Sequence, residues 1–284
     1  MDCAKVVGAR VSYPKRNFDK LKGDLRIFRK IPTLFAVPTT AGTGSEVTLT
    51  AVITDAEKKR KYTMNSFPLI PAFAVLDPKV TFSLPKHLTS TTGMDALTHA
   101  VEAYIGRSTS KETRLLSKEA VKLVIENIEV AYNDPQNYKA RENMLKAAYK
   151  AGIAFSKSYV GYVHAVAHSL GGQYNVPHGL ANTILLPIVL EEYGEKIYKK
   201  LYELALYSGI ADERDTFETG AKKFVAKIKE LNEIMEIPKT IKGIEAKDIP
   251  VMAKHADKEG NPLYPVPELM DAKALEKFYY AVME

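Results

Sequence analysis

The spacing of apolar residues changes about a third of the way along the chain. Up to residue 84, apolar runs are short and are separated by turn residues. Residues 33–37 and 72–76 each have the length of a buried strand. Apolar and polar residues alternate over 47–53 and again from Tyr62, with a charged stretch between them, which predicts a β-hairpin.

From residue 85 onward, apolar residues recur at helical spacing. Residues 121–128 place valine and isoleucine at steps of three and four, which is one face of a helix. The same spacing occurs in the segments near 140–170, 188–208, 213–236 and 270–283. Asp271 is a predicted N-cap of the last helix. We therefore predict an α/β part over residues 1–84 and a larger all-helical part over residues 85–284.

The composition is that of an ordinary globular protein. The 284 residues are 46% hydrophobic and 26% charged, which excludes a disordered or collagen-like chain and leaves room for two domains. The net charge of +6 is spread along the chain, so we expect no nucleic-acid partner. Cys3 is the single cysteine, so no internal disulfide can form. Apolar runs stay below the roughly 18 residues of a membrane span, and the start has no signal-peptide layout, so we expect a cytoplasmic protein without a membrane partner.

Three histidines lie within fifteen residues. His164 and His168 are four apart and therefore share one face of a helix. The pair Gly171-Gly172 is expected to end that helix. His178 then lies in a loop or at the start of a new helix.

A second pair with the same spacing lies upstream. Asp95 and His99 share a helix face, and Thr91 or Thr92 is a predicted cap of that helix. Two helices that each present such a pair can form a metal site in a helical bundle. One carboxylate with two or three imidazoles suits Fe²⁺ or Zn²⁺. The alternative is that the histidines are hydrogen-bonded core residues.

A loop rich in threonine and glycine follows the first predicted strand. Residues 37–47 read VPTTAGTGSEV and include Thr39, Thr40 and Thr43. Backbone N–H groups and hydroxyls in such a loop can bind a phosphate. The loop lacks the lysine of a Walker A motif and the spacing of a GxGxxG motif, so an ordinary polar turn is the alternative.

Three motifs together resemble the iron-dependent (group III) alcohol dehydrogenases. They are PTTAGTGSEVT at 38–48, GMDALTHAVEAY at 93–104 and HAVAHSLGGQYNVPHGLAN at 164–182, in the order of that family. HADKEGNPLYPVP at 255–267 is similar to the family's closing Asn-Pro segment. The resemblance covers essentially the whole chain. It implies a dinucleotide-binding α/β domain, a helical metal domain as in dehydroquinate synthases, and a site between them.

The resemblance also implies roles for residues of the helical part. His168 matches a histidine beside the metal and the nicotinamide and is the candidate catalytic residue, as a proton relay. The implied metal is Fe²⁺, with Zn²⁺ as the alternative. The implied metal ligands are Asp95, His99, His164 and His178.

In the α/β part the resemblance implies contacts with NAD or NADP. Asp2 matches the aspartate of a GGGSxxD segment that surrounds the pyrophosphate. The other implied cofactor-side residues are Thr39, Thr40, Thr43, Val52 and Lys61. The expected reaction is hydride transfer between a small alcohol and NAD(P), which converts the alcohol to an aldehyde or ketone.

The family has further strands and the glycines of the GGGSxxD segment before the residue that matches Asp2. We therefore expect a chain that lacks the first part of the nucleotide-binding domain. One alternative function is a catalytically impaired fragment that binds metal without a dinucleotide. Another is a metal-dependent lyase on the same scaffold, against which the four-ligand pattern argues. A sheet with an exposed edge favours self-association, so we expect a homo-oligomer.

Overall fold

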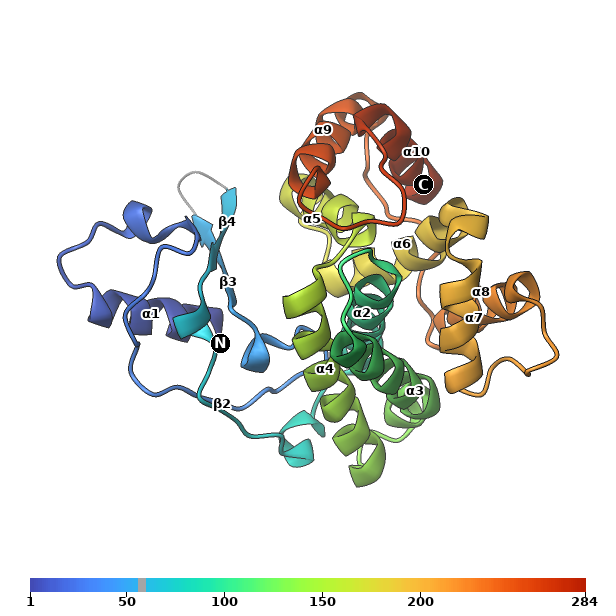
Figure 1. Ribbon diagram of the computed structural model, residues 1–284, viewed down its shortest axis with the longest axis horizontal. Coiled ribbons are helices and arrows are strands. Elements are labelled where there is room, and N and C mark those ends of the chain that lie inside the picture. Colours follow the sequence, from blue (N-terminus) through green and yellow to red (C-terminus); the bar gives the residue numbers. More distant parts are fainter. Residues whose placement is uncertain (56–59) are drawn as a thin grey trace.

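The computed structural model describes residues 1–55 and 60–284, and within these the side chains of residues 54, 55, 60 and 61 are not described. A smaller N-terminal lobe lies beside a larger helical lobe (Figure 1). The helix and strands of the smaller lobe are α1 (Asp2–Ser12), β1 (Gly23–Asp24), β2 (Phe35–Ala36), β3 (Thr50–Asp55), β4 (Arg60–Asn65) and β5 (Phe73–Ala74).

The N-terminal lobe contains two small sheets. The first has the order β1-β4-β3, and β3 and β4 form the predicted antiparallel hairpin with Thr50 opposite Asn65. The second sheet pairs β2 with β5 in parallel. β3 begins later than residue 47 because Ser45–Val47 form a 3-10 turn, η2. A core of this lobe lies between α1 and the hairpin and includes Val6, Ala9, Leu21, Ile27, Met64 and Leu69.

From Pro85 onward the described part of the chain is helical, as predicted. Its helices are α2 (Lys86–Ile105), α3 (Lys111–Asn133), α4 (Tyr138–Ser158), α5 (Tyr162–Tyr174), α6 (His178–Tyr193), α7 (Tyr198–Tyr207), α8 (Phe217–Ile234), α9 (Ile249–Gly260) and α10 (Ala272–Val282). Helix α2 is almost wholly buried from Thr89 onward and lies among α3, α4 and α6 (Figure 1). None of the described helices has the length and apolar character needed to cross a membrane.

Two predicted helix ends are wrong, for local reasons. Thr91 and Thr92 do not cap α2, which already begins at Lys86, and their hydroxyls donate instead to carbonyls one turn back. The pair Gly171-Gly172 does not end α5, which continues to Tyr174 and stops at Asn175. Asn175 has φ 54° and takes the left-handed conformation that commonly ends a helix.

Other predicted helical segments are interrupted or capped. The segment 140–170 contains two helices, because Tyr159 has φ 63° and ends α4 before α5 begins at Tyr162. This break turns the chain and lets α5 run separately from α4. Asp271 caps α10 as predicted, since its Oδ1 accepts the amide hydrogen of Ala274 at 2.8 Å.

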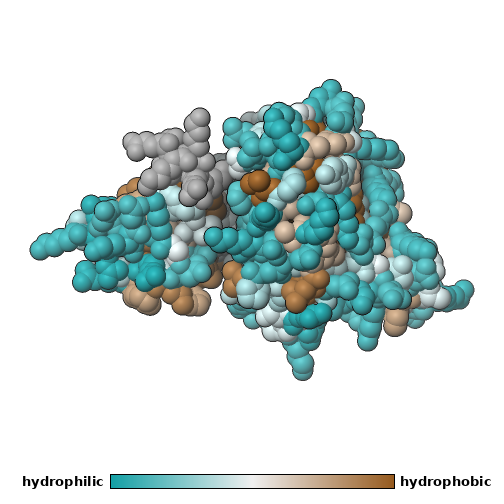
Figure 2. Space-filling model, turned by 90° about the horizontal axis from the view of Figure 1, so that it is seen from above, coloured by the Kyte–Doolittle hydropathy of each residue, from teal (hydrophilic) through white to brown (hydrophobic). Residues whose placement is uncertain are grey.

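The N-terminal lobe exposes apolar atoms along one side (Figure 2). The rings of Phe35 on β2 and Phe73 on β5 stack with centroids 4.6 Å apart, and they are 61% and 54% exposed. A two-stranded sheet is marginal when nothing covers its apolar face. This face is the surface on which the expectation of self-association rests.

Candidate metal centre

Four side chains from three helices converge inside the helical lobe. Asp95 and His99 lie one turn apart on α2, His164 lies in the first turn of α5, and His178 is the first residue of α6. One potential ligand atom from each residue lies within 4.8 Å of those of the other three. The structure therefore brings together the four residues that the resemblance implies as metal ligands.

The carboxylate of Asp95 is at the centre of this cluster. Its Oδ1 lies 3.5 Å from His178 Nε2 and 3.8 Å from His164 Nε2, and its Oδ2 lies 3.8 Å from His99 Nδ1. These separations exceed hydrogen-bond length. They leave space between the donor atoms for an ion with bonds of about 2.0–2.2 Å.

The chemistry of the donor set fits a divalent metal ion. His99 Nδ1 and His164 Nε2 are buried and have no hydrogen-bond partner among the described residues. A buried nitrogen without a partner costs about 1–3 kcal/mol, and coordination to a metal would satisfy both. Burial lowers the pKa of His99 and of His164, so both rings are neutral and offer the lone pair that a metal requires.

A buried glutamate orients His164. Glu102 lies seven residues after Asp95 on α2, and its Oε2 accepts the Nδ1–H of His164 at 2.5 Å. Its Oε1 accepts the amide hydrogen of Val163 at 2.8 Å. Burial raises the pKa of Glu102 to about 7, although the amide hydrogens lower it. This contact turns His164 Nε2 toward Asp95, the usual arrangement for a ligand histidine.

An asparagine one helical turn after His178 also contacts the cluster. Asn182 donates from Nδ2 to Asp95 Oδ1 at 2.7 Å, and the same atom lies 3.1 Å from His178 Nε2. The start of α6 is close to α2, since a Cβ at Gly179 would lie 2.6 Å from the carbonyl oxygen of Thr91. Asn182 is not among the site residues predicted from the sequence, although its i,i+4 spacing from His178 places both on one helix face.

His168 lies beside the cluster and not within it. Its ring stacks on that of His178, with centroids 5.1 Å apart and 19° between the planes. The side chains of His168 and His178 are 43% and 35% exposed, whereas that of Asp95 is 2% exposed. The cluster is therefore open to solvent on the side of these two histidines.

The glycines of the threonine–glycine loop fit close against the helical lobe. A Cβ at Gly42 would lie 2.8 Å from the carbonyl oxygen of Thr92 on α2. Gly44 has φ 60°, and a Cβ there would lie 2.7 Å from the Cα of Gly152 on α4. The close fit thus explains why both positions require glycine, independently of any phosphate binding. The loop passes directly over the helix that contains Asp95.

The threonines of this loop face outward to different degrees. Thr39 and Thr43 are exposed, and Thr40 is half-buried. Thr43 Oγ1 accepts the amide hydrogen of Ser45 at 3.3 Å. The loop therefore presents hydroxyls at the surface next to the helical lobe.

Asp2 ties the loop to the hairpin. Its Oδ1 accepts the hydroxyl hydrogen of Ser45 at 2.7 Å, and its Oδ2 accepts the amide hydrogen of Val52 at 2.9 Å. The side chain of Val52 is 43% exposed on β3. The structure thus joins Asp2, the loop and Val52, whereas the side chain of Lys61 lies outside the described residues.

Lys5, one turn further along α1, also binds the segment between the loop and β3. Its side chain is fully buried, and Nζ donates to the carbonyl oxygens of Thr48 and Thr50, each at 2.8 Å. Burial lowers the pKa of Lys5 to about 8, and the nearby carboxylates of Asp2 and Glu46 oppose that shift.

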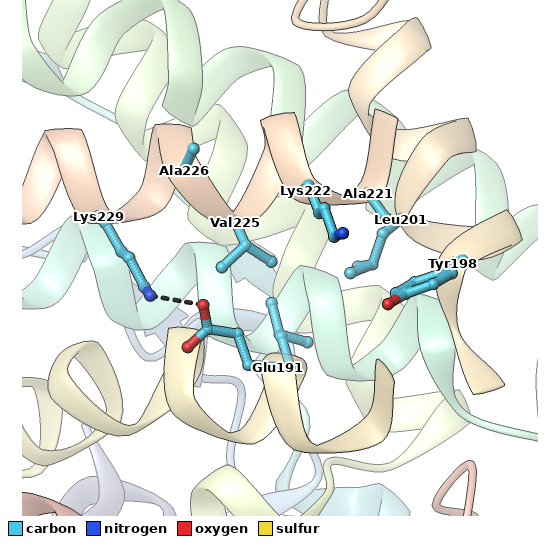
Figure 3. Close-up of a pocket in the computed structure, with 9 residues that line it drawn as sticks. Glu191, Tyr198, Leu201, Ala221, Lys222, Val225, Ala226 and Lys229 are labelled. Carbon is cyan, nitrogen blue, oxygen red and sulfur yellow. Dashed lines mark hydrogen bonds and ion pairs between the residues drawn. The ribbon is translucent and has the colours of Figure 1, made fainter. Parts of the chain in front are cut away.

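A surface groove of about 400 Å³ lies elsewhere, between α6, α7 and α8 (Figure 3). Apolar side chains including Leu201 and Val225 line it, and Lys229 at its rim pairs with Glu191 at 2.5 Å. None of the predicted site residues lines this groove.

Comparisons with known proteins agree with the fold. Residues 89–283 match the model of the Fe-containing alcohol dehydrogenase family, C-terminal, and residues 1–78 match that of the iron-containing alcohol dehydrogenases. Alcohol dehydrogenase 4 of Saccharomyces cerevisiae is 42% identical over 227 residues, which are 78% of this chain and 58% of that protein.

A second relative matches over more of the chain. The 1,3-propanediol dehydrogenase of Klebsiella pneumoniae is 37% identical over 268 residues, covering 92% of this chain and 67% of that protein. The solved structure of a 1,3-propanediol oxidoreductase superposes with a TM-score of 0.93 at 35% identity, covering 98% of this chain and 73% of that one. The chain thus spans about 58–67% of the length of these two relatives. It belongs to the iron-containing alcohol dehydrogenase family.

Proposed function

We propose that this protein is a metal-dependent oxidoreductase that transfers a hydride between a small alcohol and NAD or NADP. The alcohol loses a hydride to the nicotinamide and a proton to the solvent, and becomes an aldehyde or ketone. The observation that carries the proposal is the convergence of Asp95, His99, His164 and His178, in which two buried ring nitrogens have no hydrogen-bond partner among the described residues. The relatives named as alcohol and propanediol dehydrogenases support this substrate class.

The four converging side chains would hold Fe²⁺, or Zn²⁺ as the alternative. When bound, the metal ion supplies a Lewis acid for the alcohol oxygen, and the nicotinamide supplies the hydride acceptor. Glu102 keeps His164 oriented, and Asn182 keeps Asp95 in place. The substrate would enter from the solvent-exposed side.

His168 is the proposed catalytic residue. It lies on the open side of the cluster, and an imidazole can receive the alcohol proton and pass it to solvent. If it does so, His168→Ala will lower turnover and alter its dependence on pH. Unchanged turnover and an unchanged pH profile in this variant would exclude the relay.

The N-terminal lobe is the proposed cofactor side, with the division between lobes at residues 84 and 85. Asp2 orders the loop, and the backbone and hydroxyls of Thr39, Thr40 and Thr43 would contact the dinucleotide. Val52 and Lys61 are proposed as further contacts. The close fit of Gly42 on Thr92 supports this arrangement, because it sets the loop against the helix that bears Asp95. We also propose a cytoplasmic homo-oligomer.

Nucleotide binding and alcohol oxidation by the metal-loaded protein test this proposal. The chain is loaded with Fe²⁺ without oxygen, or with Zn²⁺, and titrated with NADH and with NADPH while nicotinamide fluorescence is recorded. We expect saturable binding of one nucleotide in the micromolar range, and alcohol-dependent reduction of its oxidised form. Absence of nucleotide binding in a protein that retains one metal ion would instead support the metal-binding fragment.

A further inference from the structure

The C-terminal region provides His168 with a carboxylate partner. Glu259 lies in the last turn of α9, and its Oε1 is 2.6 Å from His168 Nδ1. Helix α9 lies against α5, which contains His168 (Figure 1). The two residues are 91 positions apart in the sequence.

A tyrosine in the following loop holds the same carboxylate. The hydroxyl of Tyr264 donates to Glu259 Oε1 at 2.7 Å. Burial raises the pKa of Glu259, but the facing imidazole of His168 and the two hydrogen bonds outweigh it, so the pKa lies below its ordinary value. Glu259 is therefore an ionised acceptor for two donors.

An ionised carboxylate can only accept hydrogen bonds, so His168 Nδ1 must carry the hydrogen between them. In the neutral ring the lone pair is then on Nε2. The ring is also stacked on His178 and meets His164 edge-on, with centroids 5.9 Å apart. A flip of the ring would break the bond to Glu259 while keeping the stacking, so the bond to Glu259 favours one of the two orientations.

We propose that Glu259 is a positioning residue that fixes the tautomer and ring orientation of His168 beside the metal centre, with Tyr264 holding the carboxylate in place. The proposal deepens the proposed function, on which it rests for its catalytic consequence. It assigns a role to Glu259 and Tyr264 of the 259–264 segment. Loss of the outer hydrogen bond of a metal-ligating histidine typically lowers metal affinity or activity 10–100-fold, and we expect a loss of activity of the same order for His168.

The first test observes the tautomer directly. Side-chain ¹⁵N spectra of the metal-free protein labelled at histidine report which ring nitrogen carries hydrogen, and His168→Ala identifies the signals. We expect the Nδ1–H form of His168 in the wild type and in Glu259→Gln, whose amide oxygen still accepts. Glu259→Leu and Glu259→Ala remove the acceptor and should move His168 toward the Nε2–H form. An unchanged tautomer in both would overturn the proposal.

The second test measures kinetics of the metal-loaded protein. Glu259→Leu and Glu259→Ala should lower kcat at least tenfold, with little change in the KM for nucleotide, and Glu259→Gln should recover most of the loss. Tyr264→Phe should have a smaller effect in the same direction. Glu268→Gln is the matched control, because Glu268 faces Lys196 at 3.6 Å and should leave kcat unchanged.

The two tests separate the possible failures. Equal losses in Glu259→Gln and Glu259→Leu would overturn the positioning role, because an acceptor of the same shape would not restore activity. A wild-type protein with no alcohol activity would contradict the proposed function, and the ¹⁵N spectra would still decide whether Glu259 sets the tautomer of His168.

Discussion

Gly152→Ala is predicted to push the threonine–glycine loop away from α4. Gly152 lies within α4, and a Cβ there would lie 2.6 Å from Val47 Cγ2 and 3.1 Å from the Cα of Gly44. Gly44 has φ 60° and is itself close to α4. An added methyl group at residue 152 therefore has to displace the loop or α4. The threonine–glycine loop would therefore shift away from the helical lobe.

The magnitude follows from two opposing effects. Alanine in a helix interior is more favourable than glycine by about 0.8–1.0 kcal/mol. Overpacking of a close contact costs about 1–3 kcal/mol. Gly172→Ala in α5 is the matched control, because a Cβ there meets no atom within 4 Å. The free energy of unfolding of Gly152→Ala should thus lie about 1–3 kcal/mol below that of Gly172→Ala.

Urea unfolding of both variants and the wild type measures this difference. We also expect weaker nucleotide binding in Gly152→Ala, with metal binding unchanged, because the shift is confined to the loop side. If Gly152→Ala is as stable as Gly172→Ala and binds nucleotide like the wild type, the contact between the lobes is not as described.

Three further predictions concern Lys5, the cluster and the exposed face. Burial lowers the pKa of Lys5 to about 8 in the folded protein against 10.5 when unfolded, so the folded state releases this proton first as pH rises. The free energy of unfolding should therefore rise by about 2 kcal/mol between about pH 7 and about pH 9.5, relative to Lys5→Met, in paired urea titrations. Glu102→Ala leaves His164 Nδ1 and a buried amide unpaired and should weaken Zn²⁺ binding 10–100-fold by calorimetry, whereas an unchanged affinity would exclude its orienting role. The double variant Phe35→Ser, Phe73→Ser should reduce self-association in sedimentation, and an unchanged mass would remove this face as its cause.

The sequence predicted the parts of the structure that depend on local spacing. Asp95 and His99 were paired because residues four apart share a helix face, and the hairpin followed from alternation. His178 needed the family resemblance, because it begins a separate helix and its spacing from His164 has no helical meaning. The roles of these residues remain proposals.

The site residues that the sequence does not predict are those whose contacts join distant segments. Glu102 reaches His164 across 62 positions, and Glu259 reaches His168 across 91 positions. Glu102 shares a helix face with Asp95, seven residues before it, but nothing in the sequence pairs it with His164. Glu259 has no signal that distinguishes it from a surface residue of a helix. From the sequence, the glycines of the loop indicate either a phosphate-binding turn or an ordinary polar turn. The structure adds a steric reason, the close fit of Gly42 and Gly44 on two helices.

Metal binding by the cluster can be measured by calorimetric titration of the metal-free protein with Zn²⁺. We expect one ion per chain in the wild type and in His87→Ala, because His87 is exposed on the first turn of α2, away from the cluster residues of that helix. We expect His164→Ala to lose most of the affinity, because one of the two unsatisfied buried nitrogens is removed. A wild type that binds no ion, or a His164→Ala variant that binds as tightly as the wild type, would contradict metal binding by the cluster.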